Sequence, residues 1–160
     1  DEGTEAAHRK VEGVSDQEDG DEQKDAAEHG ADVVEHHADD AARQIWKGSW
    51  RIPTEAEGTA LRDEANFKWD WTDDYEGTGV AGHIVTSKVS GYEGNSIFLP
   101  AAGGRNGTSL TNAGSDGYYW SSSLLEYNSG YARDVYFYSG GVDRNLSGRY
   151  DGFSVRPVSE

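Results

Sequence analysis

Hydrophobic and polar residues alternate along a series of short segments from residue 67 onward, and glycine-rich turns separate these segments. Alternation with a period of two is typical of strands that bury one face. We therefore predict strands at residues 67–72, 82–88, 95–101, 117–123, 131–139 and 152–158.

Two segments before these strands favour helices. Thr54-Glu55-Ala56-Glu57 has the form of a capping box, in which the Thr54 hydroxyl and the Glu57 carboxylate accept hydrogen bonds from each other's amides. It predicts a helix that runs to about residue 64, which Gly58 weakens by roughly 1 kcal/mol relative to alanine. The other helix is predicted by small apolar residues at alternating steps of four and three: Ala27, Ala31, Val34, Ala38, Ala41 and Ile45.

The order of these elements indicates the fold class. Two short helices followed by a run of strands, without alternation of the two, describe an α+β domain with a mostly antiparallel, glycine-rich set of short strands. The alanine-rich helix could dock on the domain, form a coiled stalk, or reflect only the helix propensity of alanine.

Acidic residues are concentrated at the N-terminus. Residues 1–45 contain fifteen Asp and Glu, four Lys and Arg, and no aromatic residue. A segment with so little apolar surface cannot offset its ordering entropy by burial. We expect residues 1–38 to be an acidic, Ala-rich appendage, helical or disordered, and residues 39–160 to be one globular domain.

The net charge and the absence of cysteine exclude several classes of partner and chemistry. Nucleic-acid backbones are held mainly by Lys and Arg, and a chain with a net charge of −16 would repel them. No apolar run approaches the length that spans a bilayer, so we expect no membrane insertion. Without cysteine there is no disulfide framework, no thiolate nucleophile and no sulfur-ligated metal.

Candidate catalytic and metal-binding groups are few. His83 has no nucleophile and base beside it in the sequence, and we interpret it as a surface or edge-strand histidine. His29, Asp32 and His36 would share one helical face, but a solvated acidic face is the simpler interpretation. Residues 103–107 lack the Lys-Ser/Thr of a phosphate cradle, so we expect a tight loop there.

Tyrosine is concentrated near the C-terminus. Residues 117–158 hold seven of the nine tyrosines, mixed with Ser, Gly, Asn, Asp and Arg, and this is the chemistry of a paratope. Val135 and Phe137 are apolar at period two, so Asp134, Tyr136 and Tyr138 should point to the opposite face. The pattern indicates a recognition surface carried on a sheet.

A series of motifs resembles a known domain family. The motifs are WRIPT (50–54), WDWT (69–72), VTSK (85–88), GNSIFLPAAG (94–103), RNGTS (105–109), GYYWSSS (117–123) and GFSVRPV (152–158). In this order they closely resemble the FISUMP, or major paralogous, domain of bacterial surface proteins. The resemblance implies a C-type-lectin-like fold of the formylglycine-generating-enzyme type, in which the last strand pairs with one near the N-terminus.

The chain departs from this family in two places. Residues 1–38 have no match to its strand-bearing N-terminal part, so the partner of the last strand is open, and Gly58 stands where its helix usually carries a bulky residue. The formylglycine-generating enzyme depends on cysteines, so the resemblance implies its fold without its activity. The sugar-binding signature of calcium-dependent lectins is also missing, and we expect no cofactor, although a structural calcium ion in an acidic loop stays open.

The C-terminal stretch also resembles the variable region of proteins diversified by retroelements, in which adenines, usually within Asn codons, are rewritten to alter ligand specificity. Such codons cannot become Lys, Gln, Met, Trp or Glu, and in residues 121–158 only Glu126 breaks that rule. We expect ligand contacts from Tyr127, Tyr131, Arg133, Asp134, Tyr136, Tyr138, Asp143, Arg144, Leu146, Tyr150 and Asp151. We assign to core and scaffold Trp46, Trp50, Trp69, Trp71, Phe98, Leu99, Trp120, Val155 and Val158.

Together these features predict a non-enzymatic ligand-binding domain, outside the cell, on its surface or on a phage particle. Its partner would be a protein or glycan on another cell or particle. The alternatives are a structural or adhesive module without a selected small site, and an enzyme on the same fold that uses Asp and Glu. Strand propensity is the other explanation for the tyrosines, and it predicts that several of them are half-buried.

Overall fold

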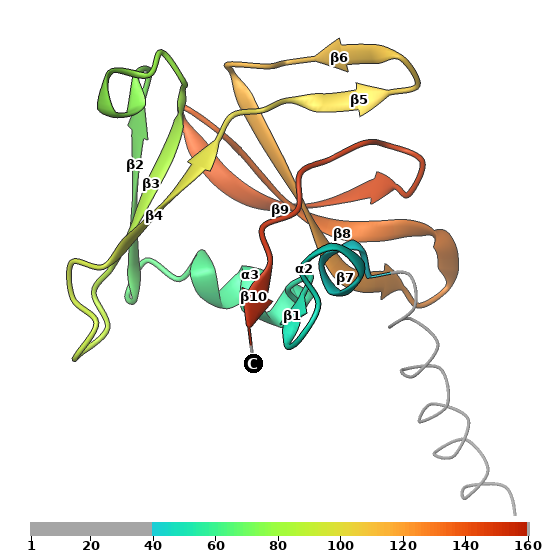
Figure 1. Cartoon of the computed structure of the whole chain (residues 1–160), viewed down its shortest axis with the longest axis horizontal. Helices are drawn as coiled ribbons and strands as arrows, with labels where there is room; N and C mark the ends of the chain where they lie inside the picture. The colour runs from blue at the N-terminus through green and yellow to red at the C-terminus, as the bar shows by residue number, and fades with distance from the viewer. Residues whose placement is uncertain (1–39, 160) are drawn as a thin grey trace, which may run out of the picture. The chain divides into compact units, whose positions relative to one another are not determined.

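The computed structural model describes residues 40–159, which form an α+β domain, as predicted (Figure 1). The elements before the C-terminal sheet are α2 (Ala41–Trp46), β1 (Trp50–Arg51), α3 (Glu55–Leu61), β2 (Phe67–Thr72), the 3₁₀ helix η1 (Tyr75–Gly77), β3 (Gly82–Ser87) and β4 (Ser96–Pro100). They are followed by β5 (Gly104–Asn106), β6 (Ser109–Thr111), β7 (Asp116–Leu125), β8 (Asn128–Tyr138), β9 (Gly141–Gly148) and β10 (Val158–Ser159). The predicted boundary between residues 38 and 39 lies outside the described residues.

The strands form four small antiparallel sheets. Two of them have three strands, in the orders β2-β3-β4 and β7-β8-β9, and the pairs β5-β6 and β1-β10 form the other two. Figure 1 shows the β2–β4 sheet apart from the β7–β9 sheet, with the β5–β6 hairpin above the C-terminal segment. Because β10 pairs with β1, the end of the described chain returns to its beginning.

Three segments differ from the sequence-based expectation. Residues 103–107 are not a tight loop, because Gly104–Asn106 pairs with Ser109–Thr111 in a hairpin. The segment 152–158 is mostly irregular, with isolated bridges at Gly152 and Ser154 before the short strand β10. Strand β9 was not predicted, since its sequence GVDRNLSG is polar and lacks clear alternation.

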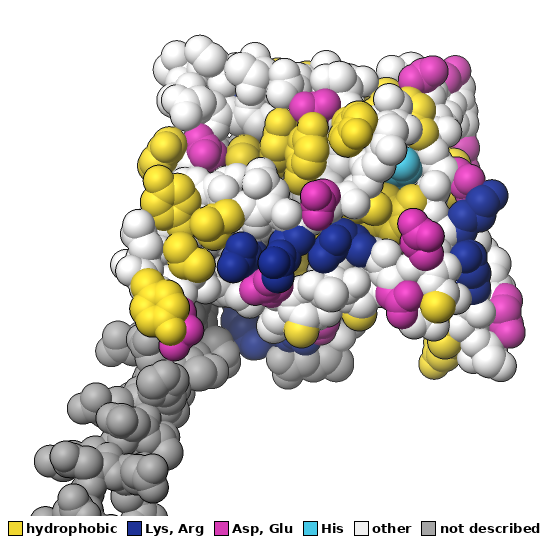
Figure 2. Space-filling model, turned by 180° about the vertical axis from the view of Figure 1, so that it is seen from behind, with side chains coloured by type: hydrophobic (Ala, Val, Ile, Leu, Met, Phe, Trp, Pro, Cys, Tyr) yellow, Lys and Arg dark blue, Asp and Glu magenta, His cyan; other side chains and the backbone are white. Residues whose placement is uncertain are grey.

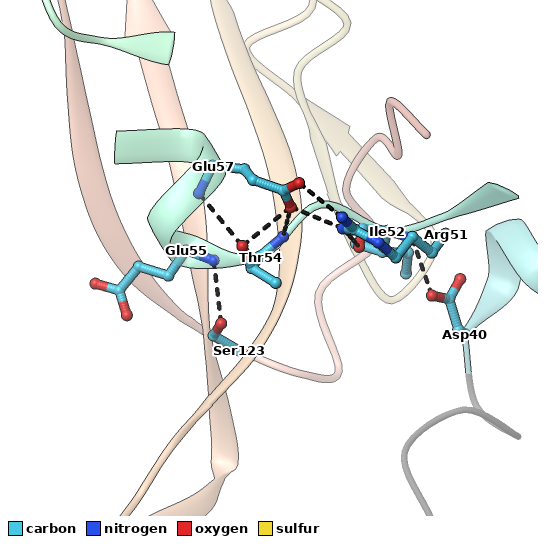
Figure 3. A network of polar contacts seen from close by, with 7 residues as sticks. All are labelled: Asp40, Arg51, Ile52, Thr54, Glu55, Glu57 and Ser123. Carbon is cyan, nitrogen blue, oxygen red and sulfur yellow. Dashed lines mark hydrogen bonds and ion pairs between the residues drawn. The ribbon is translucent and has the colours of Figure 1, made fainter. Parts of the chain in front are cut away.

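The capping box that begins α3 is confirmed. The Thr54 hydroxyl accepts from the Glu57 amide at 3.3 Å, and the Glu57 carboxylate accepts from the Thr54 amide at 2.8 Å (Figure 3). Both carboxylate oxygens of Glu57 also accept from Arg51, each at 2.7 Å. This pair is the main cause that lowers the pKa of Glu57 to about 2. The helix ends at Leu61, earlier than predicted.

Helix α3 packs closely on the C-terminal sheet through Gly58, which is buried. A β-carbon at this position would lie 3.0 Å from Cγ2 of Val135 on β8. The bulky residue that the family pattern would place here has no room, because the sheet occupies the space.

Asp40 joins α2 to the rest of the domain. Its carboxylate accepts from the amides of Ala42 and Arg43 at the helix N-terminus. It also accepts from the amide of Ile52, which follows β1, as Figure 3 shows. The N-cap therefore also anchors the backbone beside β1. The part of the predicted alanine-rich helix before residue 40 lies outside the described residues.

The core lies between the two three-stranded sheets, and Phe137 of β8 is fully buried in it. Leu99, Trp69 and Trp71 belong to it or pack against it, as predicted. Trp46 and Trp50 do not, since 51% and 40% of their surfaces are exposed. Trp46 is the last residue of α2, which buries Ala42, and Trp50 is the exposed residue of the two-residue strand β1. The other predicted core residues Phe98, Trp120, Val155 and Val158 are partly buried.

His83 is not at the surface or on an edge strand, which corrects the prediction. It lies on β3, the central strand of its sheet, and only 4% of it is exposed. Its ring centroid is 5.2 to 5.3 Å from those of Trp69, Trp71 and Phe137. Nε2 lies 2.9 Å from the carbonyl oxygen of Tyr138. His83 is therefore a packing residue that joins the two sheets.

Candidate functional site

The two faces of the β7–β9 sheet have different roles. Pairing places Tyr119 opposite Val135 and Gly117 opposite Phe137, and this inner face packs on the core and on α3. Strand alternation turns the next residues to the other side. There Tyr118 lies opposite Tyr136, Trp120 opposite Asp134 and Asp116 opposite Tyr138. We call this second side the aromatic face.

A continuous row of rings covers the aromatic face. Phe153, from the C-terminal segment, stacks on Trp120 at 4.6 Å and on Tyr118 at 4.7 Å between centroids. The row continues from Tyr118 to Tyr136 at 5.1 Å and from Tyr136 to Tyr138 at 5.9 Å. Tyr138 is 46% exposed, and the other four rings are half-buried. The face thus presents ring surface on a backbone fixed by sheet pairing.

Polar groups border one end of the row. Asp116 accepts from the Tyr118 hydroxyl at 3.1 Å and from the Asn112 side chain at 2.9 Å. Partial burial raises the pKa of Tyr118 and of Tyr136, and the charge of Asp116 raises both further. Both phenols therefore stay protonated at neutral pH.

Asp134 does not face solvent, which corrects its assignment as a ligand contact. Only 2% of the residue is exposed, and neither carboxylate oxygen has a hydrogen-bond donor in good geometry. Burial raises its pKa to about 6, the nearby Asp151 acts in the same direction, and the Ser147 hydroxyl partly opposes them. Asp134 is thus a buried acid beneath the aromatic face.

Three predicted contacts belong to the inner side of the sheet. Arg133 lies 3.6 Å and Arg144 2.8 Å from the carboxylate of Glu55 on α3. Leu146 is paired with Arg133 and is half-buried. The structure therefore does not bring all the predicted contacts onto one surface. Arg144 remains accessible, since half of its side chain is exposed.

Three other predicted tyrosines gather at the far end of β8. Tyr127 is 90% exposed in the turn between β7 and β8, and Tyr150, which follows β9, is 77% exposed. Tyr131, also exposed, pairs with Gly148, and a β-carbon on that glycine would overlap the Tyr150 ring. We call Tyr127, Tyr131 and Tyr150 the tip tyrosines.

The last two predicted contacts are acidic. Asp143 on β9 lies opposite Tyr136, 80% of its side chain is exposed, and its carboxylate is 3.8 Å from Arg62. Asp151 is half-buried and accepts from the Asn106 side chain at 3.0 Å. Both carboxylates therefore border the sheet that carries the aromatic row.

The sequence missed part of the aromatic row. Tyr118, Trp120 and Phe153 were not predicted as site residues, and Trp120 was assigned to the core. Tyr118 and Trp120 alternate with the buried Gly117 and Tyr119, a signal that could have placed them on one face. The position of Phe153 could not be read this way, because it comes from an irregular segment.

The structure also has an apolar hollow of about 340 Å³ between α3 and the β2–β4 sheet. It is lined mainly by Leu61, Phe67, Val85, Val89, Tyr92 and Ile97. Figure 2 shows hydrophobic side chains in several groups on one side of the molecule, with a row of basic side chains between them. The exposed large hydrophobic residues include Val80, Tyr92 and Leu110, so exposed apolar surface is not confined to the tyrosine-rich stretch.

Within residues 40–159, no three His, Asp or Glu side chains lie close enough to hold a metal ion. His29, Asp32 and His36 lie outside that range. None of the helices described is long and apolar enough to cross a membrane.

Comparison of the chain with protein-family models, with curated proteins and with solved structures finds no match.

Proposed function

We propose that this domain is a non-enzymatic ligand-binding protein whose C-terminal surface captures a protein or a glycan. One observation carries the proposal: of the seven tyrosines in residues 117–158, only Tyr119 is buried. The others expose ring surface on strands β7 and β8 or in the turns beside them. If strand propensity alone explained these tyrosines, more of them would be buried in the core.

The scaffold beneath these rings supports a binding role. Phe137, Tyr119 and Val135 fix the inner side of the same strands, and Gly58 brings α3 against them. A binding surface on a preorganised sheet loses little entropy when a ligand binds. The exposed side chains can therefore vary without disturbing the core.

The C-type-lectin-like fold and the FISUMP relationship are part of this proposal. The pairing of β10 with β1 is what that fold implies for the last strand. Diversification by a retroelement, and display at the cell surface, outside the cell or on a phage particle, belong to the same proposal. Diversification predicts a near-copy of the coding stretch for residues 117–158 beside a reverse transcriptase gene.

An enzymatic role is less well supported. Burial and unusual surroundings often mark catalytic groups, and here they single out His83 and Asp134. Both are almost fully covered, and His83 is enclosed by three aromatic rings. Neither group is placed to exchange a proton with a bound substrate.

A structural or adhesive module is the second candidate. It is favoured by Ile45, Trp46 and Trp50, which are exposed near α2 and β1 and could form an assembly surface.

A glycan and protein array probed with the full chain separates these functions. Selective capture of a few ligands supports recognition. Silence across the array, with self-association that Trp46→Ala and Trp50→Ala abolish, would replace the proposal by the assembly function. Turnover of an array sugar would point to an enzyme.

A further inference from the structure

The aromatic face is bordered by acidic groups. Asp116 contacts the Tyr118 hydroxyl, Asp143 lies opposite Tyr136 on the neighbouring strand, and Asp151 lies close enough to influence the buried Asp134. Asp116 therefore borders the row directly, whereas Asp143 also lies 3.8 Å from Arg62 and Asp151 accepts from Asn106.

The basic side chains of this sheet are engaged away from the row. Arg133 and Arg144 contact Glu55 of α3, and Arg149 donates to the carbonyl oxygen of Ser129 at 3.3 Å. Strands β7 and β8 contain no other Lys or Arg among the residues described. Asp143 is partly compensated, because Arg62 lies 3.8 Å from its carboxylate. The contacts of Asp116 are the Asn112 amide and the Tyr118 hydroxyl, both neutral, so its negative charge stays beside the rings.

Rings and carboxylates attract the same kind of ligand. The faces of aromatic rings carry partial negative charge and bind Lys or Arg cations within about 6 Å of their centroids. Carboxylates at the border add Coulomb attraction and can accept bidentate hydrogen bonds from a guanidinium group. Burial is the main cause that raises the pKa of Tyr118 and of Tyr136, and the charge of Asp116 contributes in the same direction.

The shape of the row indicates the size of the ligand. Consecutive ring centroids are 4.6 to 5.9 Å apart along five rings, so the surface is an elongated strip and not a closed cage. In an extended peptide, side chains on one side recur about every 6.7 Å. Several basic side chains of one segment could therefore lie along the strip together.

We infer that the aromatic face binds an extended, basic segment of a partner protein, with an Arg or Lys side chain on the exposed Tyr138 ring and beside Asp116, which lies opposite it. The inference rests on the proposed function and specifies its ligand class.

The test measures binding of the full chain to a short capped oligo-arginine peptide and to its oligo-citrulline counterpart, which has nearly the same shape without charge. Three variants are compared with the wild type: Tyr138→Phe, which keeps an aromatic face, Tyr138→Leu, which keeps apolar bulk, and Tyr92→Leu. Tyr92 is 65% exposed in the loop between β3 and β4 and serves as the matched control. All three substitutions leave the net charge unchanged at neutral pH.

We expect the arginine peptide to bind and the citrulline peptide to bind at least about tenfold more weakly. Tyr138→Phe and Tyr92→Leu should stay within about twofold of wild type, whereas Tyr138→Leu should weaken binding about 3- to 30-fold. The inference is wrong if Tyr138→Leu binds as well as wild type, if both peptides bind equally, or if phosphocholine displaces the arginine peptide. Selective array capture of a neutral or acidic ligand would overturn this inference alone and leave the proposed function standing.

Discussion

Trp120 and Asp134 lie directly opposite each other on strands β7 and β8, and they differ sharply in environment. The indole is half-buried in the aromatic row, whereas the carboxylate is 2% exposed and has no donor in good geometry. A buried acid such as Asp134 lowers the stability of the domain at neutral pH, because its charged form has lost its hydration.

Replacing Asp134 by Asn should stabilise the domain at pH 7.5. The folded-state pKa of Asp134 is about 6, above its usual 3.8, so folding favours the protonated form. Below about pH 4 the carboxyl is protonated in both states and does not lower the free energy of unfolding. As the pH rises from about 4 to 6, the free energy of unfolding decreases by up to about 3 kcal/mol. Urea unfolding should show a gain of about 1 to 3 kcal/mol for Asp134→Asn at pH 7.5 and almost none at pH 4. An equal change at both pH values would contradict the assignment, and the exposed Asp143→Asn is the control.

The Arg51–Glu57 pair should give the opposite pH dependence. The pKa of Glu57 is lowered from 4.5 to about 2, so its contribution is complete above pH 4.5 and is lost as the pH falls toward 2. The carboxylate is partly exposed, so solvent screening limits the effect, and Glu57→Ala should cost about 1 kcal/mol at pH 7. Thermal unfolding at pH 7 and pH 2 checks this, since the difference between wild type and variant should vanish at the lower pH. A difference that persists at pH 2 would refute the role of this carboxylate.

Gly117 should not tolerate alanine. Its β-carbon would overlap the ring of Phe137, which is fully buried and cannot move aside. We expect Gly117→Ala to destabilise the domain by about 1 to 3 kcal/mol or more, as overpacking does elsewhere. Gly141→Ala on β9 is the matched control, because the nearest atom to its β-carbon would be 4.0 Å away. Chemical denaturation that ranks the two variants equally would argue against the packing of β7 on β8.

The tip tyrosines should be dispensable for stability. Tyr127 and Tyr150 are 90% and 77% exposed, so replacing either with Ala should change the free energy of unfolding by less than about 0.5 kcal/mol. Phe137→Ala should cost about 3 to 5 kcal/mol in the same assay. A large loss at Tyr127 or Tyr150 would mean that these side chains pack in solution.

The local rules of the sequence predicted the elements that depend on neighbouring residues. The capping box begins α3 at Thr54, and the alternation in residues 67–72 matches β2 along its whole length. Strand β9 and the short strands β5 and β6 were missed, because their polar, glycine-rich sequences form strands only through their partners.

The candidate site was predicted only in part. Alternation correctly separated Phe137 from Tyr136 and Tyr138. It could not show that Asp134, on the same face as these two tyrosines, would be buried. Arg133 shares the period of two with Val135 and Phe137, so alternation could have placed it on the inner side. Its ion pair with Glu55, which is far away in the sequence, could not be predicted. The place of Phe153 on the aromatic row depends on an irregular segment that runs beside β7 and forms a parallel bridge with it at Tyr119 and Ser154. Such long-range contacts leave no period or motif in the sequence.

The most direct test of the binding role compares two double variants on the ligand that the array identifies. Tyr138→Ala/Tyr150→Ala removes exposed rings within the tyrosine-rich stretch, and Tyr92→Ala/Leu110→Ala removes exposed side chains outside it. We predict that the first variant loses at least about tenfold in affinity, while the second binds as the wild type does. Both should keep nearly the wild-type melting temperature. Unchanged binding by the first variant, or an equal loss in both, would contradict the claim that residues 117–158 form the recognition surface.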